Sequence, residues 1–496
     1  MKYDRRHFLA GAMASTALVG LPGCTTVNQA TGRSSFTGMY SVEDDIKLGR
    51  QEHPKLVEQF GGEYENPRLQ RYVAETGKKL ARGTEYQQFP YQFTLLNTPI
   101  VNAFALPGGY VYLSRGLIAL ASNEAEMAGV LSHELGHVNA RHTAERLSAA
   151  QMAQLGMVLG AVGGAALGLG SEAAQISQQI AMLSIQSYSR KQEFEADTLG
   201  VRYMSRAGYE PDAMVTFLST LREQSIVDAK MRGLPAGSVD KFNMMSTHPR
   251  TKDRVEKAIQ AAAVARPKNA RIGRETYLAK IDGMLFGDDP SQGYVKGRLF
   301  QHPALRFQFQ VPEGFRLMNG RDQVVAQNQS GAAIIFDTGK IQRSRDMASY
   351  LQNEWTPKTP LKDVERITIN GQEAATGWVR GQSKGGGTVD LRGVAIRRNA
   401  QSVYRMLFVN PAKDSARLAQ GYKETTYSFR RLSQAEASKI KPLRLLLVPA
   451  NKSDSIGGLS KTLPYGKYNE SWFRVLNDLK PNEGLPRNRR LKVVAA

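Results

Sequence analysis

The chain has 496 residues, 41% of them hydrophobic, and its 66 Lys and Arg against 45 Asp and Glu give a net charge of +21. This length predicts about two to four domains with ordinary globular cores. The one cysteine excludes an internal disulfide and a cysteine-rich zinc site.

Residues 1–24 are typical of a bacterial export signal. Arg5 and Arg6 precede an apolar stretch that is too short to span a bilayer, and the pair resembles a twin-arginine signal. The segment ends in Leu-Pro-Gly-Cys, which resembles a lipobox with acylation at Cys24; Thr25 after it favours the outer membrane. We therefore expect a lipid-anchored protein on the periplasmic side of the envelope, with residues 25–40 as a tether. A buried apolar helix with an ordinary cysteine is the alternative.

The next segments predict helices followed by a small sheet. Apolar residues recur at helical spacing over 42–60 and 67–80, and strand patterns cover 91–96, 101–105 and 110–113. An extended substrate can pair through its backbone with an edge strand of such a sheet. Asn102, Ala103 and Phe104 are the candidate edge, and an ordinary core hairpin is the alternative.

The most informative motif is His133-Glu134-Leu135-Gly136-His137, which lies in a helix predicted from Asn123 to Leu147. Residues four apart share one helical face, so the two imidazoles can bind one cation. A catalytic zinc needs about three protein ligands and a water. Glu134 is near the metal without pointing at it, as a general base must be. The alternative is a surface helix with two unrelated histidines.

Residues 148–171 are uncharged and rich in Gly, Ala and Leu. We expect a mobile cover over the cleft or a loop that touches the membrane. A transmembrane span would place the two halves of the site on opposite sides of the bilayer.

A second helix, predicted over 176–207, carries the rest of the site. Glu193 and Asp197 are four residues apart and share one face. Glu193 fits the third zinc ligand. Asp197 fits an acceptor for the N–H of a ligating imidazole, and Glu195 points elsewhere. The alternative is a solvated acidic face.

Together these motifs resemble metallopeptidase family forty-eight over roughly residues 40–260. The resemblance rests on the HELGH segment with Arg141-His142 after it, on Asn102-Ala103-Phe104 before it, and on Tyr188 to Asp197. It implies a mainly helical gluzincin-type domain and endopeptidase activity with one zinc per chain. The implied ligands are His133, His137 and Glu193, with Glu134 as the general base. Asp197 would accept a hydrogen bond from a ligating imidazole. The repeated apolar spans of the family's polytopic members are absent, so the exported branch fits better.

One further family feature is a His-Pro pair at His248 and Pro249. By resemblance, His248 could be a fourth, inhibitory ligand or could stabilise the oxyanion. It could also be a turn residue before a helix over 251–263. His142 and His302 are assigned no role. His142 falls five residues after His137 and off the ligand face, and His302 lies in another predicted domain.

The expected fold class is α+β, with a zinc protease domain over 41–265, an α+β sandwich over 272–435 and a small module over 455–496. In the sandwich, alternation predicts strands over 305–311, 323–327, 332–337, 365–369, 373–379, 389–397 and 402–408, and helices over 347–355 and 414–425. The C-terminal module faintly resembles a LysM-like glycan-binding domain. No 34-residue helical repeat is present.

The excess of basic residues in the C-terminal half of the chain indicates which partners the protein could bind. Residues 271–496 hold 37 Lys and Arg against 20 Asp and Glu. This balance favours anionic lipid or glycan, or is only a solvated surface. Nucleic acid is not expected, because no basic stretch is interleaved with stacking aromatics.

The sequence as a whole predicts a zinc endopeptidase of the cell envelope that degrades misfolded or stalled envelope proteins. The alternative is a periplasmic chaperone or assembly factor whose zinc site is largely closed by His248. A third reading is a basic envelope-binding lipoprotein that keeps the protease fold only structurally and binds no zinc.

Overall fold

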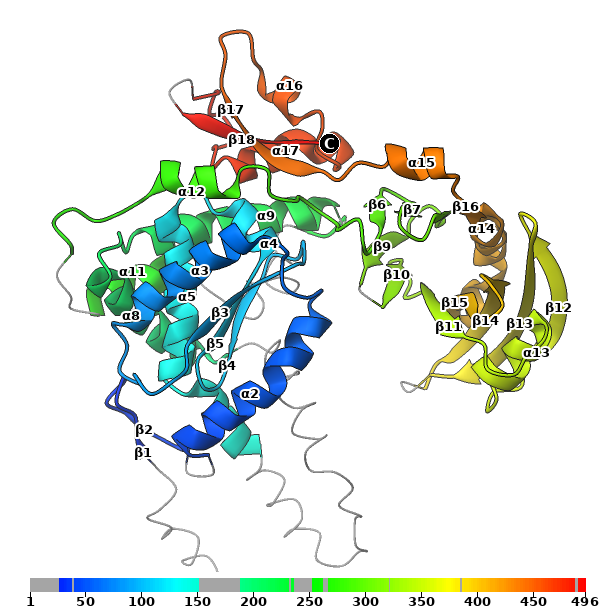
Figure 1. Ribbon diagram of the computed structural model, residues 1–496, viewed down its shortest axis with the longest axis horizontal. Coiled ribbons are helices and arrows are strands. Elements are labelled where there is room, and N and C mark those ends of the chain that lie inside the picture. The colour runs from blue at the N-terminus through cyan, green and yellow to red at the C-terminus, as the bar shows by residue number, and fades with distance from the viewer. Residues whose placement is uncertain are drawn as a thin grey trace, which may run out of the picture. The chain divides into compact units, whose positions relative to one another are not determined.

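The computed structural model describes residues 26–37, 40–150, 188–231, 233–235, 252–261, 266–320, 322–383, 386–486 and 489–496. The chain forms two compact units, coloured along the chain in Figure 1. Unit 1 comprises residues up to 58, 62–282 and 474–483, and unit 2 comprises 59–61, 283–473 and 484–496. Among the helices of these ranges, none has the length and apolar character needed to cross a membrane.

Unit 1 is mainly helical, as predicted. Its helices are α2 (Val42–Gln59), α3 (Pro67–Ala81), α4 (Arg115–Leu120), α5 (Glu124–Asn139), α8 (Arg190–Arg206), α9 (Ala213–Met231), α11 (Lys252–Ala261) and α12 (Arg274–Ile281). The predictions over 42–60 and 67–80 are confirmed by α2 and α3. Every residue of α5 is buried, and the helix packs against the sheet and against α8 (Figure 1). It is the central element of this unit.

The small predicted sheet is present in unit 1. Its strands are β3 (Gln92–Leu96), β4 (Ala103–Leu106) and β5 (Tyr110–Ser114), in the order β3-β5-β4. β3 runs parallel to β5, and β4 runs antiparallel to it. Within the described ranges β4 has β5 as its one strand neighbour and therefore forms an edge of the sheet. A short hairpin of β1 (Thr26–Val27) and β2 (Ser34–Ser35) begins the described chain.

The single helix predicted over 123–147 is wrong, because the chain turns after α5. Asn123 caps the helix start through Glu126 N, and the helix ends at Asn139. Arg141 then adopts a left-handed backbone with φ 55°, and residues 142–150 form a new helical stretch. The Arg141 guanidinium donates to Asp45 Oδ2 at 2.6 Å and to two main-chain carbonyls that precede α2. These contacts with residues distant in sequence stabilise a turn that the local sequence pattern does not predict.

The second site helix also begins later than predicted. Ser189 is its N-cap and forms a capping box with Gln192, so α8 starts at Arg190 rather than at 176. Residues 151–187 lie outside the described residues, and with them most of the expected cover over 148–171. The export signal with Cys24 and the His248 segment lie outside them as well.

Unit 2 is built on antiparallel sheets, in keeping with the predicted α+β class. A seven-stranded sheet has the order β12-β13-β14-β15-β11-β10-β9, and a four-stranded sheet has the order β16-β8-β7-β6. The strands are β6 (Tyr294–Lys296), β7 (Leu299–His302), β8 (Phe307–Gln310), β9 (Arg316–Asn319), β10 (Gln323–Gln327), β11 (Ala333–Lys340), β12 (Lys362–Ile369), β13 (Gln372–Gln382), β14 (Thr388–Arg397), β15 (Ser402–Pro411) and β16 (Arg430–Arg431). All seven predicted strands are present, and the short strands β6, β7, β9 and β16 were not predicted.

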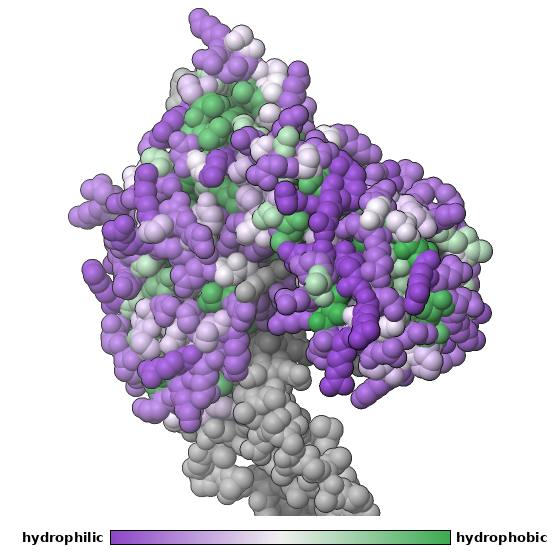
Figure 2. All heavy atoms as spheres, turned by 45° about the vertical axis from the view of Figure 1, so that its right-hand side comes forward, coloured by the Kyte–Doolittle hydropathy of each residue, from purple (hydrophilic) through white to green (hydrophobic). Residues whose placement is uncertain are grey.

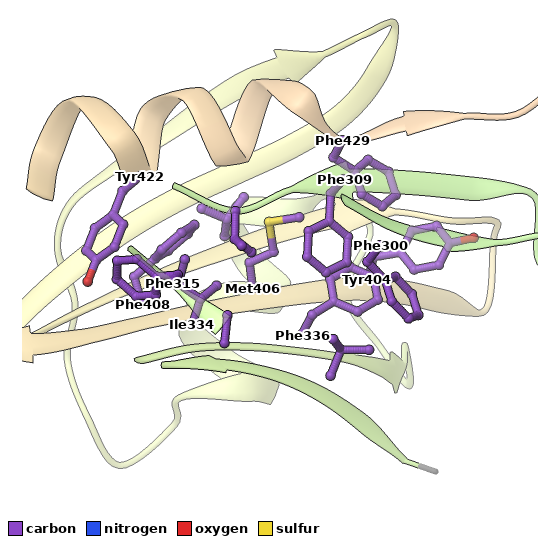
Figure 3. Close-up of a cluster of buried hydrophobic side chains, with 14 of the residues drawn as sticks. Phe300, Phe309, Phe315, Ile334, Phe336, Tyr404, Met406, Phe408, Tyr422 and Phe429 are labelled. Atoms are coloured by element: carbon purple, nitrogen blue, oxygen red, sulfur yellow. The ribbon is translucent and has the colours of Figure 1, made fainter. Parts of the chain in front are cut away.

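The core of unit 2 lies between these strands and helix α14 (Ser415–Ser428). Figure 3 shows aromatic side chains stacked in this layer, including Phe309, Phe336 and Phe408. The predicted helix over 347–355 is a short α13 (Met347–Tyr350) followed by a π-helical turn to Trp355. Strand alternation placed these apolar side chains on one face, which is why the pattern could be read from sequence.

A two-stranded pair closes the chain. β17 (Arg444–Pro449) runs antiparallel to β18 (Arg490–Ala495), and α15 (Gln434–Lys439), α16 (Ile456–Ser460) and α17 (Asn469–Leu476) are the remaining short helices. The module predicted over 455–496 therefore contains β18 but excludes β17, the strand that pairs with it. Figure 2 shows a mostly hydrophilic face with hydrophobic residues in separate patches.

Candidate metal centre

Three side chains from α5 and α8 converge in the interior of unit 1. The Nε2 atoms of His133 and His137 lie 3.0 Å apart. Glu193 places one carboxylate oxygen 3.7 Å from His133 Nε2 and the other 3.4 Å from His137 Nε2. All three are buried, and their ligand atoms lie within 4.8 Å of one another. Two imidazole nitrogens and one carboxylate are a donor set that suits a catalytic zinc and leaves a position for water.

The two helices can bring these ligands together because they cross in close contact. A Cβ on Gly136 of α5 would lie 2.5 Å from the carbonyl oxygen of Ala196 on α8. On the opposite side, a Cβ on Gly200 would lie 3.2 Å from His133 N. Side chains of ordinary size at these positions would separate the helices and move Glu193 away from the histidines.

Asp197 makes the contact with His133 that the sequence predicts. Its Oδ1 lies 2.7 Å from His133 Nδ1, and both side chains are fully buried. A proton on Nδ1 is then held by the carboxylate, so the lone pair that can bind a cation is on Nε2. Arg254 of α11 donates to Asp197 Oδ2 at 2.8 Å and to Glu193 Oε2 at 3.1 Å. Arg254 was not identified from the sequence, which gives no local signal for it.

His142, which was assigned no role, contacts the site, and that prediction is corrected. Its Nδ1 lies 2.8 Å from His137 Nδ1, and its Nε2 lies 3.0 Å from Glu195 Oε2. On one continuous helix His142 would face away from the ligands, whereas the left-handed turn at Arg141 brings its ring back to His137. Burial opposes ionisation of Glu195, but hydrogen bonds from His142 and Arg33 outweigh it and lower the pKa of Glu195 to about 2. Glu195 points away from the three candidate ligands, as predicted.

A small cavity lies beside the candidate ligands. Its lining includes His137, Tyr188 and the β4 residues Ala105 and Leu106. The Tyr188 ring stacks on His137 with centroids 3.8 Å apart. Ala103 and Phe104 of the predicted substrate edge belong to the same strand, and Asn102 immediately precedes it. The cavity thus connects the edge strand with the candidate metal centre.

Of the remaining candidates, Glu134 adjoins this cluster in sequence and the others do not. Glu134 is buried in α5, between the two histidines in sequence. His302 lies in β7 of unit 2, and the group of potential metal ligands found among the described residues does not include it. His248 and Cys24 lie outside the described residues, so their roles stay predictions.

Comparisons with known proteins identify the family of the chain. A sequence model of peptidase family M48 matches residues 67–262. The chain is 30% identical over 360 residues to the beta-barrel assembly-enhancing protease of Escherichia coli K12, a match that covers 63% of this chain and 71% of that protein. It is also 30% identical over 187 residues to the mitochondrial metalloendopeptidase OMA1 of Schizosaccharomyces pombe, covering 38% and 51%. The chain therefore belongs to peptidase family M48 and is a zinc-dependent metalloendopeptidase.

Proposed function

We propose that this metalloendopeptidase cleaves misfolded or stalled proteins of the bacterial cell envelope, using His133, His137 and Glu193 as zinc ligands. The observation that carries the proposal is the buried cluster of these three side chains beside the cavity bounded by β4. The similarity to the E. coli beta-barrel assembly-enhancing protease supports an envelope substrate.

The chemistry follows from the residues around the cluster. When bound, zinc supplies a Lewis acid for the scissile carbonyl and lowers the pKa of a water molecule. The Glu134 carboxylate takes the proton from that water and returns it to the nitrogen of the leaving amine. Asp197 keeps the His133 proton on Nδ1, so that Nε2 stays available. Burial of all three ligands removes competing bulk water and strengthens these interactions.

The β4 edge is the proposed binding strand for an extended substrate. Ser114 N donates to Asn102 O, so residues 102, 104 and 106 form the hydrogen-bonded pairs with β5. The main-chain groups of Ala103 and Ala105 then point away from β5. A substrate that pairs through them would run along the wall of the cavity that His137 also lines.

The cellular setting is proposed from the sequence. Cys24 is the lipid-bearing residue, export uses the twin-arginine route, and the anchor places the enzyme at the outer membrane. The basic residues from 271 onward, with the module at 455–496, would contact anionic lipid or glycan. His248 would regulate the site as a fourth ligand or would donate to the oxyanion.

The test combines metal analysis with one isosteric substitution. The wild-type protein should contain about one zinc per chain and cleave unfolded casein. Glu134→Gln should keep the zinc and lose activity by roughly 10²–10⁴-fold. Glu75→Gln, an isosteric change at an exposed position of α3, is the control and should cleave normally. Zinc-free protein, or equal cleavage by Glu134→Gln, would refute the proposal and favour a chaperone.

A further inference from the structure

An arginine from the N-terminal hairpin contacts the surroundings of the candidate metal centre. Arg33, which immediately precedes β2, donates through Nε and Nη2 to the two carboxylate oxygens of Glu195, at 3.2 and 3.0 Å. The same guanidinium donates to both oxygens of Glu145, at 3.1 and 3.4 Å. One side chain therefore joins α8 to the helical stretch that follows α5. In Figure 1, β1 and β2 lie beside the lower end of α8.

The hairpin itself is fixed to the helices that carry the ligands. The buried Asn28 accepts hydrogen bonds from Ala30 N and Thr31 N within the turn, and its Nδ2 donates to Asn139 O at 2.8 Å. Asn139 is the last residue of α5. Arg202 of α8 donates to Ala30 O at 3.2 Å. The hairpin is thus docked on the end of α5 and along α8, and Arg33 reaches Glu195 from this docked segment.

From Arg33 a continuous series of hydrogen bonds leads to His137. If His137 binds a cation through Nε2, its proton must be on Nδ1 and must be donated to His142 Nδ1, 2.8 Å away. His142 then carries its own proton on Nε2 and donates it to Glu195 Oε2 at 3.0 Å. Arg33 holds that carboxylate from the other side, with two hydrogen bonds in a forked geometry. Each ring has one tautomer compatible with both of its neighbours.

The two ligand histidines are therefore supported in different ways. His133 is held directly by Asp197, which Arg254 orients. His137 is held by His142, which Glu195 and then Arg33 orient. In both cases an arginine orients a carboxylate by hydrogen bonds. The carboxylate then orients His133 directly, or His137 through the ring of His142. The arginine for His133 comes from α11, and the arginine for His137 comes from the N-terminal hairpin.

We propose that the hairpin is a positioning element of the zinc centre: Arg33, acting through Glu195 and His142, fixes the tautomer and orientation of His137 and so sets the affinity for zinc. The inference rests on the proposed ligand set. Outer contacts to a metal-binding histidine typically contribute roughly 10–100-fold to metal affinity. A segment that begins directly after the predicted signal then becomes part of the active centre, nine residues after Cys24.

The test measures the zinc dissociation constant of the full-length protein by competition with a chelator. Arg33→Ala and His142→Phe should each weaken zinc binding roughly 10–100-fold. His142→Gln, whose amide can accept from His137 and donate to Glu195, should recover most of the affinity. Arg202→Ala is the matched control, because it removes a hairpin contact without touching Glu195, and it should stay within about twofold of wild type.

Two further measurements separate positioning from folding. The visible spectrum of the cobalt-substituted protein should change in Arg33→Ala and remain unchanged in Arg202→Ala, while the Tm values of the two metal-free variants should agree. Wild-type affinity in Arg33→Ala, or an affinity loss that matches that of Arg202→Ala, would refute the positioning role. If His137→Ala binds zinc like wild type, the ligand set itself is wrong, and the inference fails for that separate reason.

Discussion

The guanidinium of Arg254 lies 3.1 Å from the carboxylate of Glu193, the proposed third zinc ligand. The same group donates to Asp197, so two carboxylates that have no exposure to solvent share the single positive charge of one arginine. Buried carboxylates at this proximity disfavour the folded state unless a positive charge compensates them. Arg254 supplies one positive charge whether or not a metal is bound, and a divalent zinc ion would supply two more.

Arg254→Ala should therefore make folding depend on zinc. Removing one partner of a buried ion pair costs about 3–5 kcal/mol, and we expect this loss in the metal-free protein. Saturating zinc should restore a large part of it, because the metal neutralises Glu193. Urea unfolding with and without zinc measures both values. The control is Arg266→Ala, which breaks an exposed pair with Asp212 and should change stability by less than about 1 kcal/mol. Equal losses with and without zinc would contradict the prediction.

Gly136→Ala tests the close approach of α5 and α8. The added methyl would lie 2.5 Å from the main-chain oxygen of Ala196, so a helix must move. We expect a stability loss of about 1–3 kcal/mol and a larger loss of activity, because displacement of Glu193 disturbs the ligand geometry.

Gly129→Ala is the matched control on the same helix. Its methyl would meet Met214 Cγ at 2.9 Å, and this flexible side chain can move. The helix propensity of alanine offsets the remaining contact, so stability should change by less than about 1 kcal/mol and activity should persist. Thermal unfolding and casein cleavage measure both variants. If Gly136→Ala were as active as Gly129→Ala, the helix contact would not determine the site geometry.

The features read correctly from the sequence are those with local periodicity. His133 and His137 share a helical face, as do Glu193 and Asp197, and these four side chains do converge. The strands of unit 2 were found because alternation places residues such as Phe336 and Phe408 on one face. The catalytic roles of His133, His137, Glu193 and Asp197 stay predictions, while the convergence of these side chains agrees with the helical spacing.

The features missed from the sequence depend on contacts between distant residues. The left-handed turn at Arg141 is stabilised by Asp45, 96 residues earlier, and without that turn His142 cannot be placed next to His137. Arg33 and Arg254 reach the site from elements 162 and 57 residues away from their partners. A single sequence gives no signal for such pairs. Strands of three or four residues, such as β6, are likewise too short for a periodic pattern.

Ala105→Pro tests the proposed substrate strand. The N–H of Ala105 points away from β5, so proline would remove a bond to the substrate without breaking the pairing with β5. Loss of about one such hydrogen bond should lower kcat/KM on extended peptides roughly tenfold, with zinc content unchanged. Ala105→Val is the control, because it retains the N–H and adds bulk at the same position. A tenfold loss in Ala105→Val as well would show that the cavity wall, and not the N–H, is responsible.

His302 predicts how the stability of unit 2 depends on pH. Burial, with a contribution from Arg398, lowers the pKa of His302 from 6.5 to about 4, and its Nδ1 accepts a hydrogen bond from Leu305 N. Between pH 6.5 and 4 the unfolded chain binds a proton that the folded chain does not, so this contribution is complete above pH 6.5 and is lost as the pH falls towards 4. The loss should reach roughly 2–3 kcal/mol. All three tryptophans lie in unit 2, so tryptophan fluorescence in urea reports this unit. His302→Asn keeps an acceptor for Leu305 N but cannot titrate, and an unchanged pH dependence in this variant would assign the effect to another group.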